Sequence, residues 1–170
     1  MTKPVWLPEE FQYDGNWEEF IECVYQVFKQ DFMQTQPSYQ GRIVTCDTKI
    51  IDGKEAGFWH IVQRHDSQLN ERLPDLRRCS RIPWPKPIIE NNSSPILSVW
   101  RVDRKKAGKP RQKRILIWLE EFDYLVVLAE RKRVVVLVTA YCTDIESHKN
   151  KLRKERDKYY EMQKPPDWAT

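Results

Sequence analysis

Thr139 and Tyr141 place two hydroxyl groups two residues apart near the end of an apolar run. Side chains two apart in a strand share a face, so we expect these hydroxyls to point one way and Val138 and Ala140 the other. Such hydroxyls can hold a phosphate or a sugar, and a tyrosine ring can stack on a base. The alternative is an ordinary packing role, since both residue types favour strands.

Basic side chains are concentrated in the C-terminal half of the chain. Residues 104–114 contain seven basic residues and no acid, residues 131–133 are Arg-Lys-Arg, and residues 149–158 add six more basic residues. The net charge is only +4 because acids gather near the N-terminus. A separated basic zone suits a polyanion, while a solvated surface is the alternative. The candidate contacts are Lys105, Lys106, Arg111, Arg131 and Arg133.

The cysteines and histidines show no metal-binding spacing. The four cysteines lie far apart, which predicts reduced, partly buried thiols. His60, His65 and Cys79 could meet at a metal only if the fold brought them together, and their spacing does not favour it. We therefore expect neither a metal nor another cofactor.

Three short apolar runs at 115–119, 124–128 and 134–138 organise the chain. They are rich in β-branched and aromatic residues and are separated by charged clusters short enough for hairpin loops. With a first strand at 96–102 they predict a four-stranded antiparallel meander, whose near-continuous apolar character indicates that both faces are partly covered.

The remaining elements are expected before and after this sheet. Asn16 could cap an amphipathic helix over 17–33, and a further helical pattern covers 55–64. Short strands are expected at 41–46 and 48–51, a loop at 65–68, and a short helix opening near Pro74 that carries Arg77, Arg78 and Arg81. A strongly basic helix should begin at 144–147 and end near 162.

These elements predict an α+β fold, with N-terminal helices packed on the meander and a basic C-terminal helix. The 170 residues favour one domain, with its core over about 16–143 and the basic helix over about 144–162. No apolar run approaches the roughly 18 residues that span a bilayer, and the first residues lack a secretory signal. We therefore expect a cytoplasmic protein that does not bind membranes.

The order of these motifs resembles the barnase–EndoU–colicin–RelE (BECR) ribonuclease superfamily, in particular its phage-associated branch. The resemblance covers roughly residues 41–141. The residues that carry it are Gly57-Phe58-Trp59-His60-Ile61, Pro74 to Trp84, Pro87-Ile88-Ile89-Glu90-Asn91 and Leu137-Val138-Thr139-Ala140-Tyr141.

The resemblance implies metal-independent RNA cleavage on the open face of the sheet. A ribose 2′-hydroxyl would attack the adjacent phosphate, leaving a 2′,3′-cyclic phosphate and a 5′-hydroxyl. Histidine suits the acid or base because its ordinary pKa is about 6.5, and arginine suits the charged phosphorane. His60 is then the acid/base candidate, Arg78 and Arg81 bind phosphate from one helix face, and Thr139 and Tyr141 face the substrate.

Several alternatives remain open at this point. His60 could be a packed histidine, the arginines could form surface ion pairs, and His65 and Arg64 are reserve site residues. The implied partner is RNA, possibly tRNA, and a toxin-like or phage-related ribonuclease would need a neutralising immunity protein. The competing hypotheses are a noncatalytic nucleic-acid-binding module of the same fold and a metal-dependent nuclease.

Overall fold

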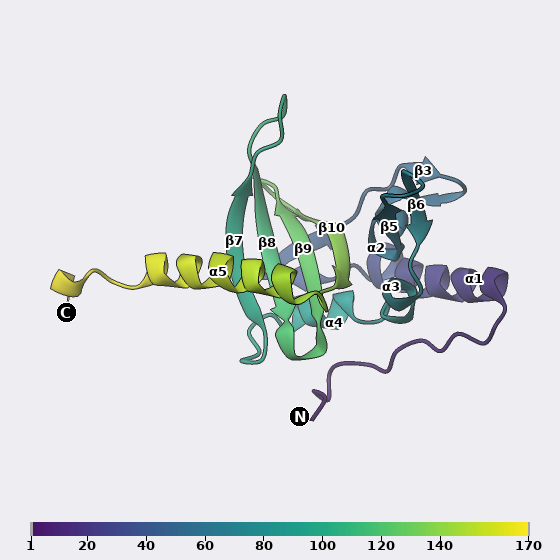
Figure 1. Cartoon of the computed structure of the whole chain (residues 1–170), viewed down its shortest axis with the longest axis horizontal. Coiled ribbons are helices and arrows are strands. Elements are labelled where there is room, and N and C mark those ends of the chain that lie inside the picture. Colours follow the sequence, from purple (N-terminus) through teal and green to yellow (C-terminus); the bar gives the residue numbers. More distant parts are fainter. Residues whose placement is uncertain (1, 170) are drawn as a thin grey trace.

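A six-stranded mixed sheet forms the centre of the protein (Figure 1). The computed structural model describes residues 2–169. In their order across the sheet, the strands are β1 (Ser38–Tyr39), β2 (Arg42–Thr45), β10 (Val135–Cys142), β9 (Tyr124–Glu130), β8 (Gln112–Leu119) and β7 (Ser98–Arg104). The predicted α+β class is confirmed.

The sheet is larger than the predicted four-stranded meander. Strands β7 to β10 are antiparallel neighbours in sequence order, but β2 adds to β10 in parallel, with Val44 opposite Val135 and Thr45 opposite Val136. Strand β1 then pairs with β2 in antiparallel. Only the first two residues of β10 pair with β2, so a helix can pack along the remaining length of this edge of β10.

The first helix begins as predicted and ends differently. The Asn16 side chain accepts a hydrogen bond from Glu19 N at 3.2 Å, which caps α1. The α-helix then gives way to a π-helical segment that ends at Gln34. The helical segments are α1 (Trp17–Phe28), η1 (Lys29–Gln34), α2 (Ala56–Val62), α3 (Leu76–Ser80), α4 (Pro85–Glu90), η2 (Glu120–Phe122), α5 (Glu146–Gln163) and η3 (Asp167–Ala169).

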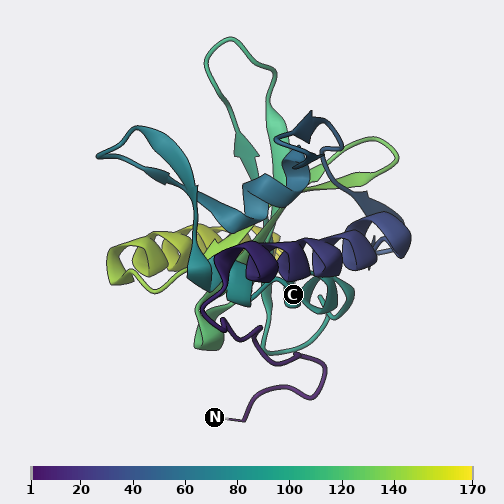
Figure 2. The same cartoon turned by 90° about the vertical axis from the view of Figure 1, so that its right-hand side faces the viewer.

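Two small hairpins flank α2. The first joins β3 (Ile50–Ile51) to β4 (Lys54–Glu55), and the second joins β5 (Gln63–Asp66) to β6 (Glu71–Pro74). The expected helix over 55–64 is therefore too long, and the expected loop over 65–68 is wrong at its first two residues. The Asp66 carboxylate accepts hydrogen bonds from Gln68 N and Leu69 N, which turns the chain back. Figure 2 shows the β5–β6 hairpin extending from the body of the protein.

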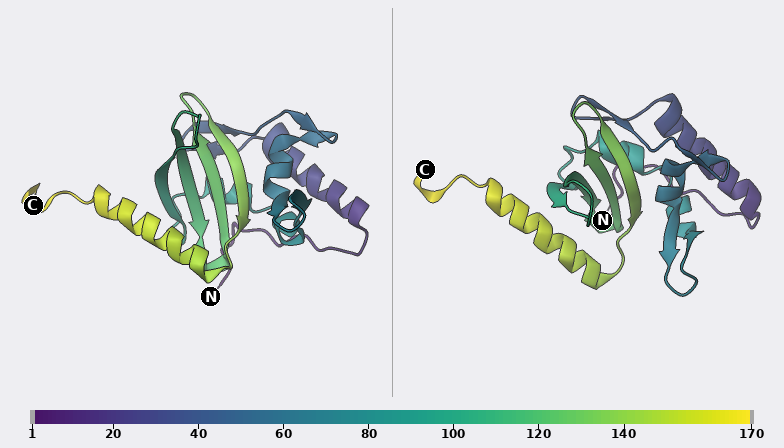
Figure 3. Two further views of the ribbon diagram at one scale, coloured as in Figure 1. Left: turned by 45° about the horizontal axis from the view of Figure 1, so that its top comes forward. Right: turned by 90° about the horizontal axis from the view of Figure 1, so that it is seen from above.

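Both faces of the sheet are covered. On one face, α1, α2 and α4 contribute Phe28, Phe58 and Ile88 to the main core. Helix α5 lies across the other face (Figure 3), where its Leu152 packs in a second cluster with Trp100, Leu116, Trp118 and Leu125. Strand β9 and the second half of β8 are apolar almost throughout because they are buried from both sides.

Polar contacts also fasten α5 to the sheet. Trp100 Nε1 donates to Glu155 Oε1 of α5, and Trp118 Nε1 donates to Thr143 Oγ1 in the segment that leads from β10 to α5, each at 3.0 Å. The sheet face that was expected to be open is therefore partly occupied, because its two tryptophans need cover. No helix within residues 2–169 is both long and apolar enough to cross a membrane.

Gly57 allows α2 to approach the segment that follows β2. A Cβ at this position would lie 2.7 Å from Cys46 Cβ and 3.2 Å from Asp47 N and O. Gly57→Ala should therefore lower the free energy of unfolding by about 1–3 kcal/mol through overpacking, although alanine is the better helix former. Urea unfolding of the two proteins measures this difference. A more stable variant would show that helix propensity outweighs the close contact.

Candidate functional site

Helix α2 covers the part of β10 that lacks a strand neighbour. Thr139 Oγ1 donates a hydrogen bond to the carbonyl oxygen of His60 at 2.8 Å, which fixes the helix against the strand. Leu137 pairs with Leu128 and Thr139 with Val127, so Val138 is an extra residue in a bulge.

This bulge changes which side chains face the site. Val138 lines the same depression as Thr139 and Tyr141, whereas Ala140 is fully buried. The expectation that Val138 shares a face with Ala140 is therefore wrong, because strict alternation fails where one strand carries an additional residue.

The depression between α2, the β5–β6 hairpin and β10 has a volume of about 430 Å³. Its lining combines imidazole, guanidinium and hydroxyl groups and, across the described part of the chain, includes no carboxylate. The lining residues are His60, Arg64, His65, Arg72, Arg78, Lys106, Val138, Thr139 and Tyr141. The structure thus brings together His60, Arg78, Thr139 and Tyr141, and both reserve residues join them.

The His60 imidazole is free to act on a ligand. It makes no hydrogen bond with any side chain or backbone group of residues 2–169, and its neighbour Trp59 holds α2 to the first hairpin by donating to Ile51 O at 2.7 Å. Burial lowers the pKa of His60, and the positive charge of Arg72 acts in the same direction against the opposing effect of Asp47. At neutral pH the ring is therefore uncharged and able to accept a proton.

Arg78 is held with its guanidinium at the depression. One nitrogen donates to Gln63 O at 2.6 Å, and the guanidinium carbon lies 5.4 Å from the centre of the Tyr141 ring. Burial lowers the pKa of Arg78, but an arginine remains charged at neutral pH. Since a guanidinium has five N–H donors, several remain for an anionic ligand.

Arg81 does not reach this depression. It donates to Glu10 Oε1 at 3.1 Å and to the carbonyl oxygens of Phe122 and Asp123, and it lies over the Trp84 ring. The expectation that Arg78 and Arg81 share one face is wrong because α3 ends at Ser80 and Arg81 has left the helical conformation. Arg81 instead ties the N-terminal segment to the sheet.

His148 is a site residue that the sequence reading missed. Its Nε2 lies 3.1 Å from the Tyr141 hydroxyl, and the two rings lie 5.7 Å apart. Burial raises the pKa of Tyr141 and lowers that of His148, so this contact joins a protonated hydroxyl to a neutral imidazole. The signal in the sequence was that the third histidine of the chain lies near the start of the helix that comes after β10.

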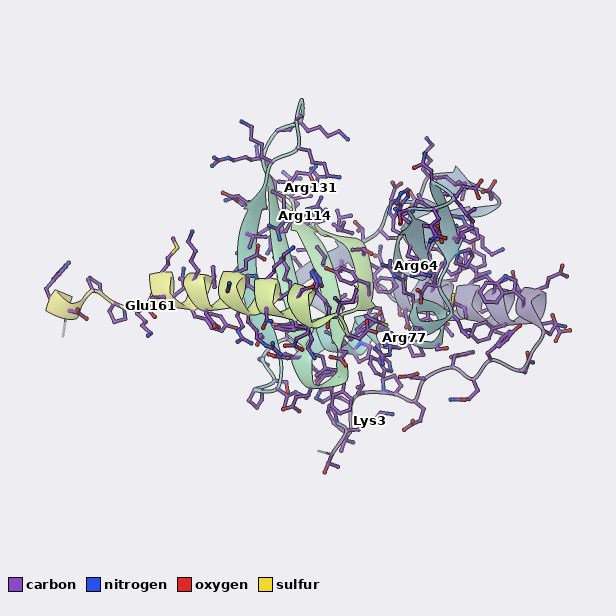
Figure 4. The ribbon with its side chains drawn as sticks, viewed as in Figure 1. Lys3, Arg64, Arg77, Arg114, Arg131 and Glu161 are labelled. Atoms are coloured by element: carbon purple, nitrogen blue, oxygen red, sulfur yellow. The ribbon has the colours of Figure 1, made fainter. Side chains whose placement is uncertain are left out.

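A second depression of about 560 Å³ adjoins the first. The two share Arg64, Arg78 and Tyr141. The other residues that line it are Asp75, Leu76, Arg77, Cys142, Asp144, Ile145 and His148. Figure 4 labels Arg64 and Arg77, which both lie beside the β10 end of the sheet.

The predicted polyanion contacts lie on two loops at one end of the sheet. Lys105, Lys106 and Arg111 follow β7, and Arg131 and Arg133 precede β10. Lys106 lines the first depression, and the other four are exposed. Figure 4 shows Arg131 close to Arg114 of β8. These cations extend the positive surface beyond the site.

Helix α5 uses much of its positive charge within the molecule. Arg153 and Arg156 both pair with Glu120, at 2.6 and 2.8 Å, and Lys149 pairs with Asp123. These ion pairs fasten the helix to the turn after β8. The basic helix, whose charge suited a polyanion, is therefore also a structural element.

The possible metal ligands do not cluster. Within the described residues, no group of three or more His, Cys, Asp or Glu side chains could hold a metal ion. His60 and His65 line the first depression, but Cys79 is fully buried in the main core.

Comparison of the chain with protein-family models, curated proteins and solved structures gives no significant match.

Proposed function

We propose that the protein is an endoribonuclease that cleaves RNA by transesterification without a metal. The observation that carries the proposal is the first depression, where a neutral histidine, a fixed arginine and two hydroxyl-bearing side chains surround a cationic space. The similarity of these motifs to BECR ribonucleases, including phage-associated toxins, supports the same chemistry.

In this mechanism the uncharged His60 removes the proton from a ribose 2′-hydroxyl. The resulting oxygen attacks the adjacent phosphorus, and the bond from phosphorus to the 5′-oxygen breaks. Arg78, with Arg64 and Arg72, stabilises the extra negative charge of the phosphorane. Tyr141, whose raised pKa keeps its hydroxyl protonated, supplies a proton to the leaving 5′-oxygen. The products are a 2′,3′-cyclic phosphate and a 5′-hydroxyl.

The exposed cations suit an RNA substrate such as tRNA. The two loops at one end of the sheet place Lys105, Lys106, Arg111, Arg131 and Arg133 where they can contact phosphates flanking the cleaved bond. A cell that makes a toxin of this kind would need an immunity protein, and an acidic surface on that partner would complement these loops.

A noncatalytic nucleic-acid-binding module is the second candidate. The observation that favours it is that both hydroxyls have partners within the protein, since Thr139 donates to the His60 carbonyl and Tyr141 pairs with His148. Under this reading the same cations bind RNA and no bond breaks.

Incubation of the purified protein with total cellular RNA in EDTA, followed by analysis of fragment ends, tests the proposal. Discrete fragments with 2′,3′-cyclic phosphate ends support the ribonuclease. Cleavage abolished by EDTA would indicate a metal-dependent nuclease. Tight, salt-sensitive binding without cleavage of total RNA or purified tRNA would support the binding module.

The pH dependence of cleavage should reflect the lowered pKa of His60. The neutral imidazole is the active base, and burial keeps it neutral to a lower pH than a free histidine. The acid limb of kcat/KM should therefore have its midpoint below the ordinary value of 6.5. Initial rates between about pH 4 and pH 8 locate this limb, because this interval brackets the ordinary pKa of a histidine. A midpoint above 6.5 would indicate a carboxylate partner or another base.

A further inference from the structure

The second depression combines charged groups with exposed aliphatic side chains. Leu76 and Ile145 both line it and are 44% and 65% exposed. Aliphatic side chains at this exposure gain stability when a flat apolar surface covers them. Its volume of about 560 Å³ lies within the range of small-molecule sites in proteins.

Two guanidinium groups lie where the two depressions meet. Arg64 and Arg78 line both depressions, and Tyr141 is the third residue that the two depressions share. Arg64 Nε lies 3.4 Å from the Asp75 carboxylate, which restrains its position. A phosphodiester bound by these arginines would have one nucleoside in each depression.

Polar groups in the second depression match the edge of a nucleobase. Because His148 Nε2 contacts the Tyr141 hydroxyl, the other ring nitrogen, Nδ1, can donate to or accept from the edge of a base, according to the tautomer. Asp144 receives the Arg77 guanidinium at 2.5 Å and retains further acceptor capacity for an exocyclic amine. The hydrogen-bonding groups of His148 and Asp144 thus line the same depression as the aliphatic side chains of Leu76 and Ile145.

We infer that this depression is a second nucleotide subsite, which binds the unpaired base next to the cleaved phosphate between Leu76 and Ile145. The inference rests on the proposed ribonuclease function and specifies its substrate as single-stranded RNA or a loop. A base in a duplex is stacked and paired, so it cannot enter such a subsite without being displaced.

The test uses short oligodeoxynucleotides that contain a single central ribonucleotide, so that only one bond can be cleaved. Abasic residues replace each flanking nucleotide in turn, and all four bases are used at the ribonucleotide. In the wild-type protein one abasic position should lower kcat/KM roughly tenfold, in line with the apolar area that a base would bury against two aliphatic side chains.

The Leu76→Ala/Ile145→Ala double variant should lose roughly tenfold on the intact oligonucleotide and show no further loss with the abasic one. Leu69→Ala removes an aliphatic side chain that is 62% exposed on the β5–β6 turn, and it should behave as the wild type. Circular dichroism confirms that each variant is folded.

The outcomes separate this inference from the proposed function. Cleavage by the wild type that tolerates every abasic residue, or an abasic loss that persists in the double variant, would overturn the subsite and leave the ribonuclease intact. If no oligonucleotide is cleaved, the proposed function fails for these substrates. Fluorescence anisotropy with the same oligonucleotides then decides whether the double variant has lost recognition of one base.

Discussion

Replacing His60 with alanine should lower RNA cleavage by about 10²- to 10⁴-fold, the usual contribution of a positioned general base. The imidazole makes no hydrogen bond within residues 2–169, and Thr139 binds the backbone of this residue. The substitution should therefore leave the fold unchanged. Initial rates on total RNA or tRNA, measured beside thermal unfolding, check both expectations.

His65→Ala is the matched control because this histidine lines the same depression from the β5–β6 hairpin. We expect it to lose less activity than His60→Ala. Undiminished cleavage by His60→Ala would transfer the role of base to His65 or Tyr141.

Arg78→Ala should lower kcat by about 10²- to 10³-fold, because it removes a preorganised donor to the phosphorane. Arg78→Lys should also be impaired, since an ammonium lacks the planar fork with which a guanidinium grips two phosphate oxygens while a further N–H bonds Gln63 O. The measurement is single-turnover cleavage at saturating protein, which separates the chemical step from binding.

Arg81→Ala is the control for loss of an arginine from the same segment. This side chain is 15% exposed and bonds to two backbone carbonyls and Glu10. Its removal should cost about 1–3 kcal/mol of stability, since buried acceptors lose their donor, while cleavage per folded molecule stays unchanged. If Arg81→Ala loses cleavage as severely as Arg78→Ala at full folding, the assignment of Arg78 as the phosphate ligand is wrong.

The local elements were predictable where one physical signal dominates. β-Branched runs separated by charged turns located β8, β9 and β10, and the Asn16 cap located the start of α1. The same periodicity could not predict the parallel pairing of β2 with β10, because partner choice depends on contacts remote in sequence. The β5–β6 hairpin was missed because Gln63–Asp66 is polar and carries no strand signal.

The site was predictable in its residue types but not in its assembly. His60, Arg78, Thr139 and Tyr141 were chosen for their chemistry, and the structure places them in one depression. Arg81 was assigned to the site on the assumption that the helix continues through it, but α3 ends at Ser80, one residue before Arg81. The bulge at Val138 has no local sequence signature, and the third histidine was a signal for the position of His148 but not for its contact with Tyr141, which depends on how neighbouring elements pack.

The hydrogen bond from Thr139 to the His60 carbonyl joins residues 79 positions apart in the chain. Contacts of this separation form late, because a long loop must close before they contribute any stability. During synthesis α2 and α3 leave the ribosome well before β10, so the nascent chain carries its histidine and arginine without the strand that completes the depression. A ribonuclease built in this way would remain inactive on the ribosome that makes it, and RNA near the exit tunnel would be spared until the last strand is in place.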